Sequence, residues 1–188
     1  MLVLPLLVAA CSASNIAAPF GSGDSASAVT EDRLLQTAQA DPGGDIGGGA
    51  ANAHCPQVVA WPKDRVITVY QGQTGDRLSV VHQSEITKLA RECQLYSDRV
   101  IVRYGVAGRV LLGPKGQAGT VTLPISIRVA SADQKTLATD KMNIPTTIPA
   151  GNPVGYFSMV KEIAFPIAVG TRPEDYKVFI AFEHAGGG

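Results

Sequence analysis

The feature that most constrains the fold of this chain is a series of segments rich in β-branched and aromatic residues, recurring about every ten residues. In several of these segments apolar and polar residues alternate, which is the pattern of a strand with one buried face. Glycine, proline and polar residues of the kind that form turns separate them. The segments are Arg65–Tyr70, Leu78–Val81, Arg99–Leu112, Thr120–Ala130, Thr136–Ile148, Phe157–Val169 and Tyr176–Phe182. About seven such strands predict an all-β fold, an immunoglobulin-like antiparallel β-sandwich.

Two segments need separate treatment. In Ser84–Leu95 four apolar residues recur at the spacing of a helix face: Ile86, Leu89, Ala90 and Cys93. We nevertheless favour a strand that pairs with Arg99–Leu112 through a turn near Ser97, because the neighbouring segments are strands and no clear helix stop signal follows. In Thr120–Ala130, Pro124 predicts an edge strand or a bulge, because proline has no backbone N–H for a sheet ladder.

The N-terminus has the pattern of an export signal. Met1–Ala10 is almost wholly apolar; it is too short for a bilayer core, which needs about 20 apolar residues, but it suits the apolar part of a signal peptide. Leu7–Cys11 resembles the lipobox of bacterial lipoproteins. That resemblance implies that the Cys11 thiol carries a lipid and that residues 1–10 are removed. Ser12, in place of aspartate, implies the outer membrane, facing the periplasm, rather than the inner membrane.

A signal peptide normally opens with basic residues, yet the first basic residue here is Arg33. We therefore expect the true start to lie upstream of Met1.

Residues 11–54 are expected to form a tether. The segment is rich in alanine, glycine and serine, has too little apolar surface to offset the entropy of ordering, and is predicted to be disordered. Thr30–Ala38 is the exception: it suits a short helix capped by Thr30, which is marginal in water without packing. A transient helix and a partner-docking motif both remain open. The predicted organisation is a signal peptide (1–10), a lipidated tether (11–54), a β-sandwich domain (55–184) and a tail (185–188).

The three cysteines divide by position. With Cys11 lipidated, Cys55 and Cys93 remain, and an even pair in an exported protein predicts a disulfide. Closing this loop is worth about 4 kcal/mol on the chain-entropy model. A metal site using His54 beside Cys55, or a reactive thiol pair, has less support, because the chain has no CxxC and no second histidine near in sequence.

The remaining pattern argues against several functions. Lys+Arg and Asp+Glu both number 16, so no cationic excess favours nucleic acid. His54, His82 and His184 are scattered, and we predict no metal site. No GxSxG occurs, and the glycines between Gly108 and Gly119 lack the Lys-Ser/Thr of a phosphate loop. We predict no catalytic residue, no cofactor and no enzymatic activity; Glu162 and Glu183 are expected to be outward-facing carboxylates.

Four stretches resemble a group of alphaproteobacterial envelope lipoproteins that combine a lipobox, a low-complexity tether and a β-sandwich. They are CPQVVAW from Cys55, EITKLARECQLYSDRVIV from Glu85, GPKGQAG from Gly113 and DYKVFIAFE from Asp175. The resemblance implies location in the envelope and says nothing of activity.

The expected function is therefore a lipid-anchored binding or structural module of the cell envelope. Its membrane partner is reached through the lipid, and a protein partner is expected to add to an exposed sheet edge, for which Thr120–Ala130 is the candidate. The alternative is a periplasmic carrier or hydrolase acting on lipid or cell-wall material. A deep apolar pocket with convergent polar groups would favour that alternative, and a filled core the binding module.

Overall fold

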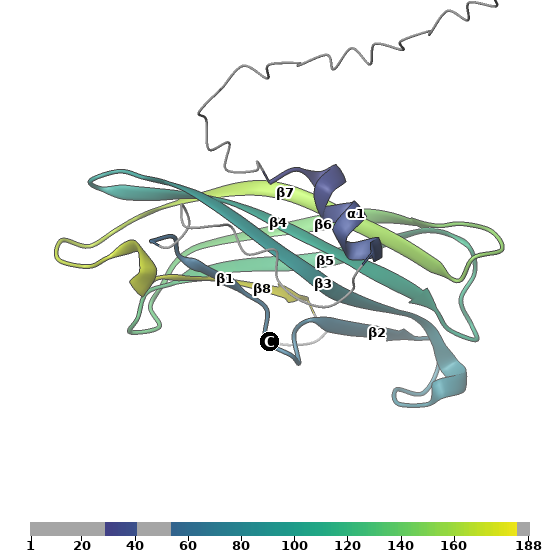
Figure 1. Ribbon diagram of the computed structural model, residues 1–188. Coiled ribbons are helices and arrows are strands. Elements are labelled where there is room, and N and C mark those ends of the chain that lie inside the picture. The colour runs from purple at the N-terminus through teal and green to yellow at the C-terminus, as the bar shows by residue number, and fades with distance from the viewer. Residues whose placement is uncertain (1–28, 41–53, 184–188) are drawn as a thin grey trace, which may run out of the picture.

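The alternating segments form two four-stranded sheets that pack face to face in a computed structural model, which describes residues 29–40 and 54–183 (Figure 1). One sheet has the strand order β1-β8-β5-β6: β1 (Gln57–Val59), β8 (Lys177–Phe182), β5 (Gly119–Ala130) and β6 (Thr136–Ile148). The other has the order β2-β3-β4-β7: β2 (Val66–Tyr70), β3 (Val80–Leu95), β4 (Arg99–Leu112) and β7 (Val154–Pro166). All pairs are antiparallel except β1 with β8. The predicted sandwich is confirmed, with eight strands in place of about seven.

Short helical segments complete the described chain. The helix α1 spans Glu31–Ala40, and two 3-10 turns span Arg77–Ser79 and Pro173–Asp175. None of the helices in the described residues is long and apolar enough to cross a membrane.

Strand β3 resolves the ambiguous segment in favour of the predicted strand. It pairs with β4 along its length, and a bulge shifts the register between Ile86 and Lys88. The extra residue moves the core-facing positions from even to odd numbers, so that Ile86 and Leu89 both face the core although they are three positions apart. Ala90 faces the opposite way, towards α1. A bulged strand with apolar residues on both faces thus reproduces the spacing of a helix.

The prediction that Thr120–Ala130 is an edge strand is wrong, because β5 lies between β8 and β6. Pro124 is tolerated there because it lies where β8 ends. The Pro124 carbonyl accepts a hydrogen bond from the Glu183 N–H at 3.0 Å, just beyond the last residue of β8, Phe182. An N–H group at position 124 would have added only one more hydrogen bond at the end of the β5–β8 ladder, so the ladder tolerates its absence.

The space between the sheets is filled by apolar side chains from both. Each fully buried residue of this size contributes roughly 1.5–3 kcal/mol of transfer free energy. The core residues that are completely inaccessible to solvent include Ile86, Val100, Val102, Val106, Val110, Leu123, Ile125, Val129 and Val178.

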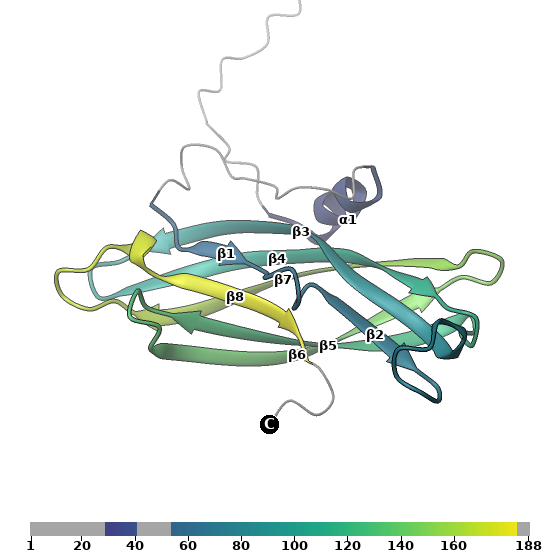
Figure 2. The same ribbon diagram turned by 90° about the horizontal axis from the view of Figure 1, so that it is seen from below.

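Helix α1 covers the outer face of the β2-β3-β4-β7 sheet, on the side away from β5, β6 and β8 (Figures 1 and 2). Leu34 is 1% exposed and packs over small residues of β3 and β4. A Cβ at Gly105 would overlap the side chains of Leu34 and Val29, so glycine at this position lets the helix pack closely against the sheet. The Val29 N–H donates to Glu92 Oε1 at 2.6 Å, and the Val160 N–H donates to Glu31 Oε1 at 3.2 Å.

Residues 29–40, which include the exceptional segment Thr30–Ala38 of the predicted tether, form α1 and are folded against the sheet. A ten-residue helix is marginal alone, and it is stabilised here by a packed apolar face. The other tether residues, 11–28 and 41–53, with the predicted signal peptide and Cys11, lie outside the described residues, as does the predicted tail.

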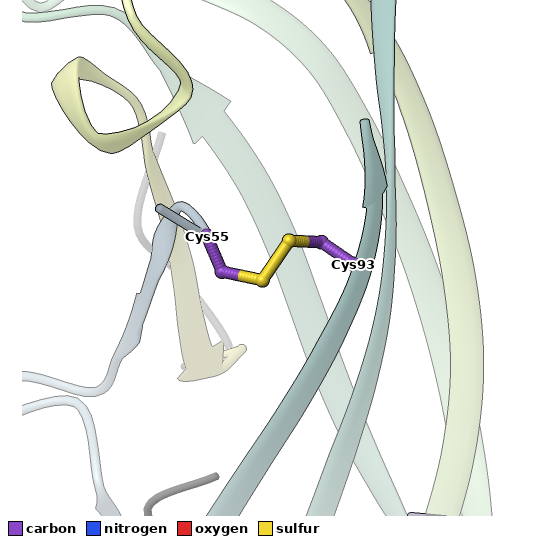
Figure 3. The surroundings of a disulfide bond; sticks show 2 residues. All are labelled: Cys55 and Cys93. Carbon is purple, nitrogen blue, oxygen red and sulfur yellow. A yellow bond between two sulfur atoms is a disulfide. The ribbon is translucent and has the colours of Figure 1, made fainter. Parts of the chain in front are cut away.

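The predicted disulfide between Cys55 and Cys93 is confirmed, with Cα atoms 5.8 Å apart (Figure 3). Cys55 lies two residues before β1, in one sheet, and Cys93 lies in β3, in the other. The bond therefore ties the two sheets together at the start of the sandwich.

Replacing both cysteines with serine is expected to lower the free energy of unfolding by about 4 kcal/mol, because the unfolded chain regains the entropy of a loop that spans 38 positions. Urea unfolding followed by circular dichroism measures this change. Reductant should destabilise the wild type and leave the double variant unaffected; equal unfolding midpoints in the two proteins would contradict this account.

Gly105→Val is expected to displace α1 and leave the sandwich intact, because the added side chain occupies the site of Leu34. Trypsin cleavage after Arg33, an exposed residue of α1, should then become at least about fivefold faster, as overpacking costs about 1–3 kcal/mol. Gln36→Ala, on the exposed side of the helix, is the matched control and should not change the rate. Cleavage of the wild type as fast as that of Gly105→Val would show that α1 is not docked.

Candidate functional site

The outer face of the β1-β8-β5-β6 sheet carries ordered rows of side chains set by the strand register. Alternate residues point outward, and Arg128 of β5 pairs with Phe179 of β8 and with Thr139 of β6. One step along the strands, Ser126 pairs with Ala181 and with Lys141. Ser126 and Ala181, the small residues of this second row, leave a depression beside Arg128 and Phe179 of the first.

This depression is a hollow of about 310 Å³, here called the Trp61 hollow. Its size is at the lower end of ligand sites. Figure 2 shows β8, β5 and β6, the strands that form its floor. The lining residues are Trp61, Asp64, Ser126, Ile127, Arg128, Thr139, Asp140, Lys141, Phe179, Ile180 and Ala181.

The aromatic wall of the hollow is built from Trp61 and Phe179. Their ring centroids lie 5.3 Å apart at 77°, an edge-to-face contact. The backbone at Trp61 is fixed because its carbonyl accepts hydrogen bonds from the N–H groups of Asp64 and Arg65, at 2.9 and 3.0 Å. The Trp61 side chain is nevertheless 49% exposed. A half-exposed indole on a hydrogen-bonded turn is a surface that a ligand can cover at low entropic cost, because tryptophan has only two side-chain torsions to fix.

Cationic groups lie against both rings. The guanidinium carbon of Arg128 lies 4.6 Å from the Phe179 centroid, and Lys63 Nζ lies 5.9 Å from the Trp61 centroid. Within the described chain the Arg128 guanidinium has this ring contact and donates no hydrogen bond, so its N–H groups are available to a ligand.

The polar groups of the hollow include both donors and acceptors. Lys141 Nζ lies 2.6 Å from Glu183 Oε1, and this ion pair forms one rim. Ser126 and Thr139 supply hydroxyl groups and Asp64 a carboxylate. Two acidic residues, Asp64 and Asp140, balance the two basic residues of the lining. The arrangement can bind a ligand that has both polar groups and an apolar face.

The residues predicted from the sequence lie elsewhere. Cys55 and Cys93 form the disulfide, while Cys11 and His184 lie outside the described residues. His54 pairs with Glu174 at 3.8 Å. Across residues 29–40 and 54–183, no group of three or more His, Cys, Asp or Glu side chains is placed to hold a metal.

His82 is buried in β3, where its Nδ1 lies 3.3 Å from Ser84 Oγ. Burial lowers its pKa below the usual value of 6.5.

Of the two carboxylates expected to face outward, Glu183 pairs with Lys141, a residue of the Trp61 hollow. Glu162 lines a shallow depression of about 540 Å³ beside α1, together with Glu31 and Arg103. That depression is polar and open and has no aromatic residue. It offers less to a ligand than the Trp61 hollow does.

The polar residues Lys161, Asp140 and Tyr104, which lie between the sheets, have a structural role. Lys161 of β7 lies 3.8 Å from Asp140 of β6, joining the edge strands of the two sheets. Burial, with a smaller contribution from Asp140, raises the pKa of Tyr104 well above its usual value of 10. Tyr104 therefore stays protonated and serves as part of the core.

The residues that form the Trp61 hollow were not singled out from the sequence. Trp61 is the single tryptophan of the chain, and Phe179 stands at an outward position of the alternating run KVFIAF. These two signals are visible in the sequence, but only the register between β8, β5 and β6 shows that the side chains meet.

Comparison with known proteins gives little further information. No protein-family model and no curated protein matches the chain. Among solved structures, the variable (V) domain of the AgI/II polypeptide BspA of Streptococcus agalactiae is 12% identical, with 68% of this chain and 78% of that chain covered at a TM-score of 0.19. A likeness at this score supports no inference about function.

Lowering the pH through the ordinary range of histidine is expected to destabilise the fold, because His82 binds a proton more weakly when folded than when unfolded. The stability present above about pH 6.5 should be lost progressively as the pH falls from there to the lowered native pKa. Urea midpoints of the wild type and His82→Gln between neutral and acidic pH test this. The variant should show a shallower pH dependence; identical slopes would contradict it.

Proposed function

We propose that this protein is a lipid-anchored, non-enzymatic binding module of the cell envelope, attached through Cys11 to the outer membrane and facing the periplasm. Its Trp61 hollow is the surface that contacts the ligand. The apolar stretch before Cys11 supports the anchor, since LVAAC has the form of a lipobox.

The observation that carries the binding role is the difference between the two outer faces of the sandwich. Helix α1 covers the outer face over β3, β4 and β7. The outer face over β8, β5 and β6 carries no such cover within the described chain and presents Trp61 at 49% exposure. Exposed tryptophan and arginine side chains in a depression are typical of the residues that dominate binding energy.

The filled core supports a binding module over the alternative of a lipid carrier or hydrolase. A carrier for an acyl chain needs an enclosed apolar cavity, whereas side chains such as Val102, Val106 and Ile125 pack between the sheets with no exposed surface. The Trp61 hollow lies on the outside of a sheet and suits a ligand that lies along the surface.

Docking of α1 bears on how far the module reaches from the membrane. With α1 seated on the sheet, only residues 12–28 separate Cys11 from Val29. Such a segment spans at most about 60 Å when fully extended. The Trp61 hollow lies on the sheet opposite α1. It therefore faces away from the side of the sandwich at which the anchored segment joins α1.

Co-sedimentation with delipidated cell envelope tests this function. The full chain carrying Cys11→Ser, which has no lipid, should bind the envelope through the hollow. Adding Trp61→Ala should weaken binding at least about tenfold, as expected for a central binding residue.

Tyr96→Ala is the matched control, because Tyr96 is 44% exposed and carries Arg99 4.9 Å from its ring centroid. It should bind as the parent chain does. Equal binding by the Trp61 and Tyr96 variants would refute the assignment of the surface. Cell fractionation tests the anchor separately. The native chain with Cys11 should fractionate with the outer membrane, and the Cys11→Ser variant with the soluble periplasm. The same fractionation for both proteins would refute the anchor.

A further inference from the structure

The composition of the Trp61 hollow allows its ligand class to be narrowed, on the assumption that the proposed function is correct. A flat apolar surface comes first. The Trp61 indole stands edge-to-face against Phe179, and Lys63, an exposed side chain, is the cation over the indole. A ligand that displaces Lys63 can lay an apolar face on the ring, as stacking ligands do on exposed aromatic residues.

Charge is the second constraint. The lining has two acidic and two basic residues; Lys63 adds one cation beside the indole, and Glu183, the ion-pair partner of Lys141, adds one anion. A polyanion would require a clear excess of cations to offset its charge. A purely apolar ligand would leave Asp64 and the Arg128 guanidinium desolvated without partners, which is costly. The hollow therefore favours an uncharged ligand with many hydrogen-bonding groups.

Hydrogen bonding is the third constraint. Arg128 offers donors, Asp64 offers an acceptor, and the hydroxyl groups of Ser126 and Thr139 offer both. An uncharged ligand that uses both kinds of group across three strands must itself carry paired donors and acceptors at short intervals. Hydroxyl groups meet this requirement, and sugar rings combine them with an apolar face of C–H groups.

The dimensions agree with a short oligomer. The floor crosses β8, β5 and β6, which at about 4.8 Å per strand gives a width near 10 Å, and the volume is about 310 Å³. The surface is a depression on a sheet, so a chain longer than the hollow can pass across it.

We infer that the Trp61 hollow binds a neutral oligosaccharide. One sugar ring lies against the Trp61 indole, the Arg128 guanidinium donates hydrogen bonds to ring substituents from its position over Phe179, and the Asp64 carboxylate accepts a hydrogen bond from a hydroxyl group. Such a ligand is either a free oligosaccharide or a stretch of a longer envelope glycan.

The experiment uses the full chain carrying Cys11→Ser and follows tryptophan fluorescence, which reports on this site alone because Trp61 is the only tryptophan. The probes are neutral tetrasaccharides of N-acetylglucosamine, glucose and mannose, with tetragalacturonate as an acidic probe of equal length. At least one neutral probe should give a saturable change, and the acidic probe should bind more weakly. Arg128→Ala should weaken the neutral complex at least about tenfold, while Tyr96→Ala should leave it unchanged.

Several outcomes overturn the inference. No saturable change with any neutral probe, tighter binding of tetragalacturonate, or equal affinity for Arg128→Ala and the parent chain each contradicts a neutral sugar at this site. Circular dichroism and urea midpoints confirm that each variant is folded.

Envelope binding separates this inference from the proposed function. If the chain still co-sediments with delipidated envelope in a Trp61-dependent manner while no neutral probe binds, the ligand class is wrong and the function stands. If a bound neutral probe also releases the chain from the envelope, the natural ligand is part of an envelope glycan. If a neutral probe binds while the chain shows no Trp61-dependent co-sedimentation, the ligand is a free oligosaccharide and the envelope-binding function is wrong.

Discussion

The covalent link between Cys55 and Cys93 is the constraint on which the candidate site depends. Strand β1 has only three residues and pairs with β8 alone, in parallel, so its ladder is too short to hold it firmly. The disulfide fixes the residues just before β1 to β3 in the opposite sheet (Figure 3). Trp61 follows β1 by two residues, and its ring meets Phe179 of β8, the strand on which β1 lies. The turn after Trp61 is also held to β8, because the Phe182 N–H donates to the Asp64 carbonyl at 3.0 Å. A bond between the sheets thus helps to position the aromatic wall of a surface on the outside of one of them.

The two outer faces of the sandwich differ in how their apolar side chains are covered. On the β3-β4 side, Ala90, Gly105 and Ala107 make a flat seat that α1 covers, which removes apolar surface from water. On the β8-β5 side, Phe179 is screened by Trp61 and Arg128, and the small residues beside them leave an open depression. One face is completed by the chain itself, and the other is left available to a ligand.

Local pattern was sufficient for most of the fold and for none of the hollow. Alternation identified runs such as Arg99–Leu112 because their period depends on the strand alone. It misjudged Pro124, because the place of this residue at the end of the β8 ladder depends on Glu183, a partner 59 positions away. Local pattern also predicted only a marginal helix for α1, because the surface that stabilises Leu34 lies far along the chain, around Gly105. The hollow depends on the register of three strands and was beyond the reach of local pattern for the same reason.

Oxidative footprinting in the intact envelope tests the central claim most directly, which is that the Trp61 hollow is the contact surface. Trp61 and Tyr96 are 49% and 44% exposed, and each lies beside a basic side chain, so they form an internally matched pair. The account predicts that Trp61 is oxidised much less in the envelope than in the purified full chain, while oxidation of Tyr96 is the same in both. Equal oxidation of Trp61 in the two preparations, or equal protection of both residues, would contradict it.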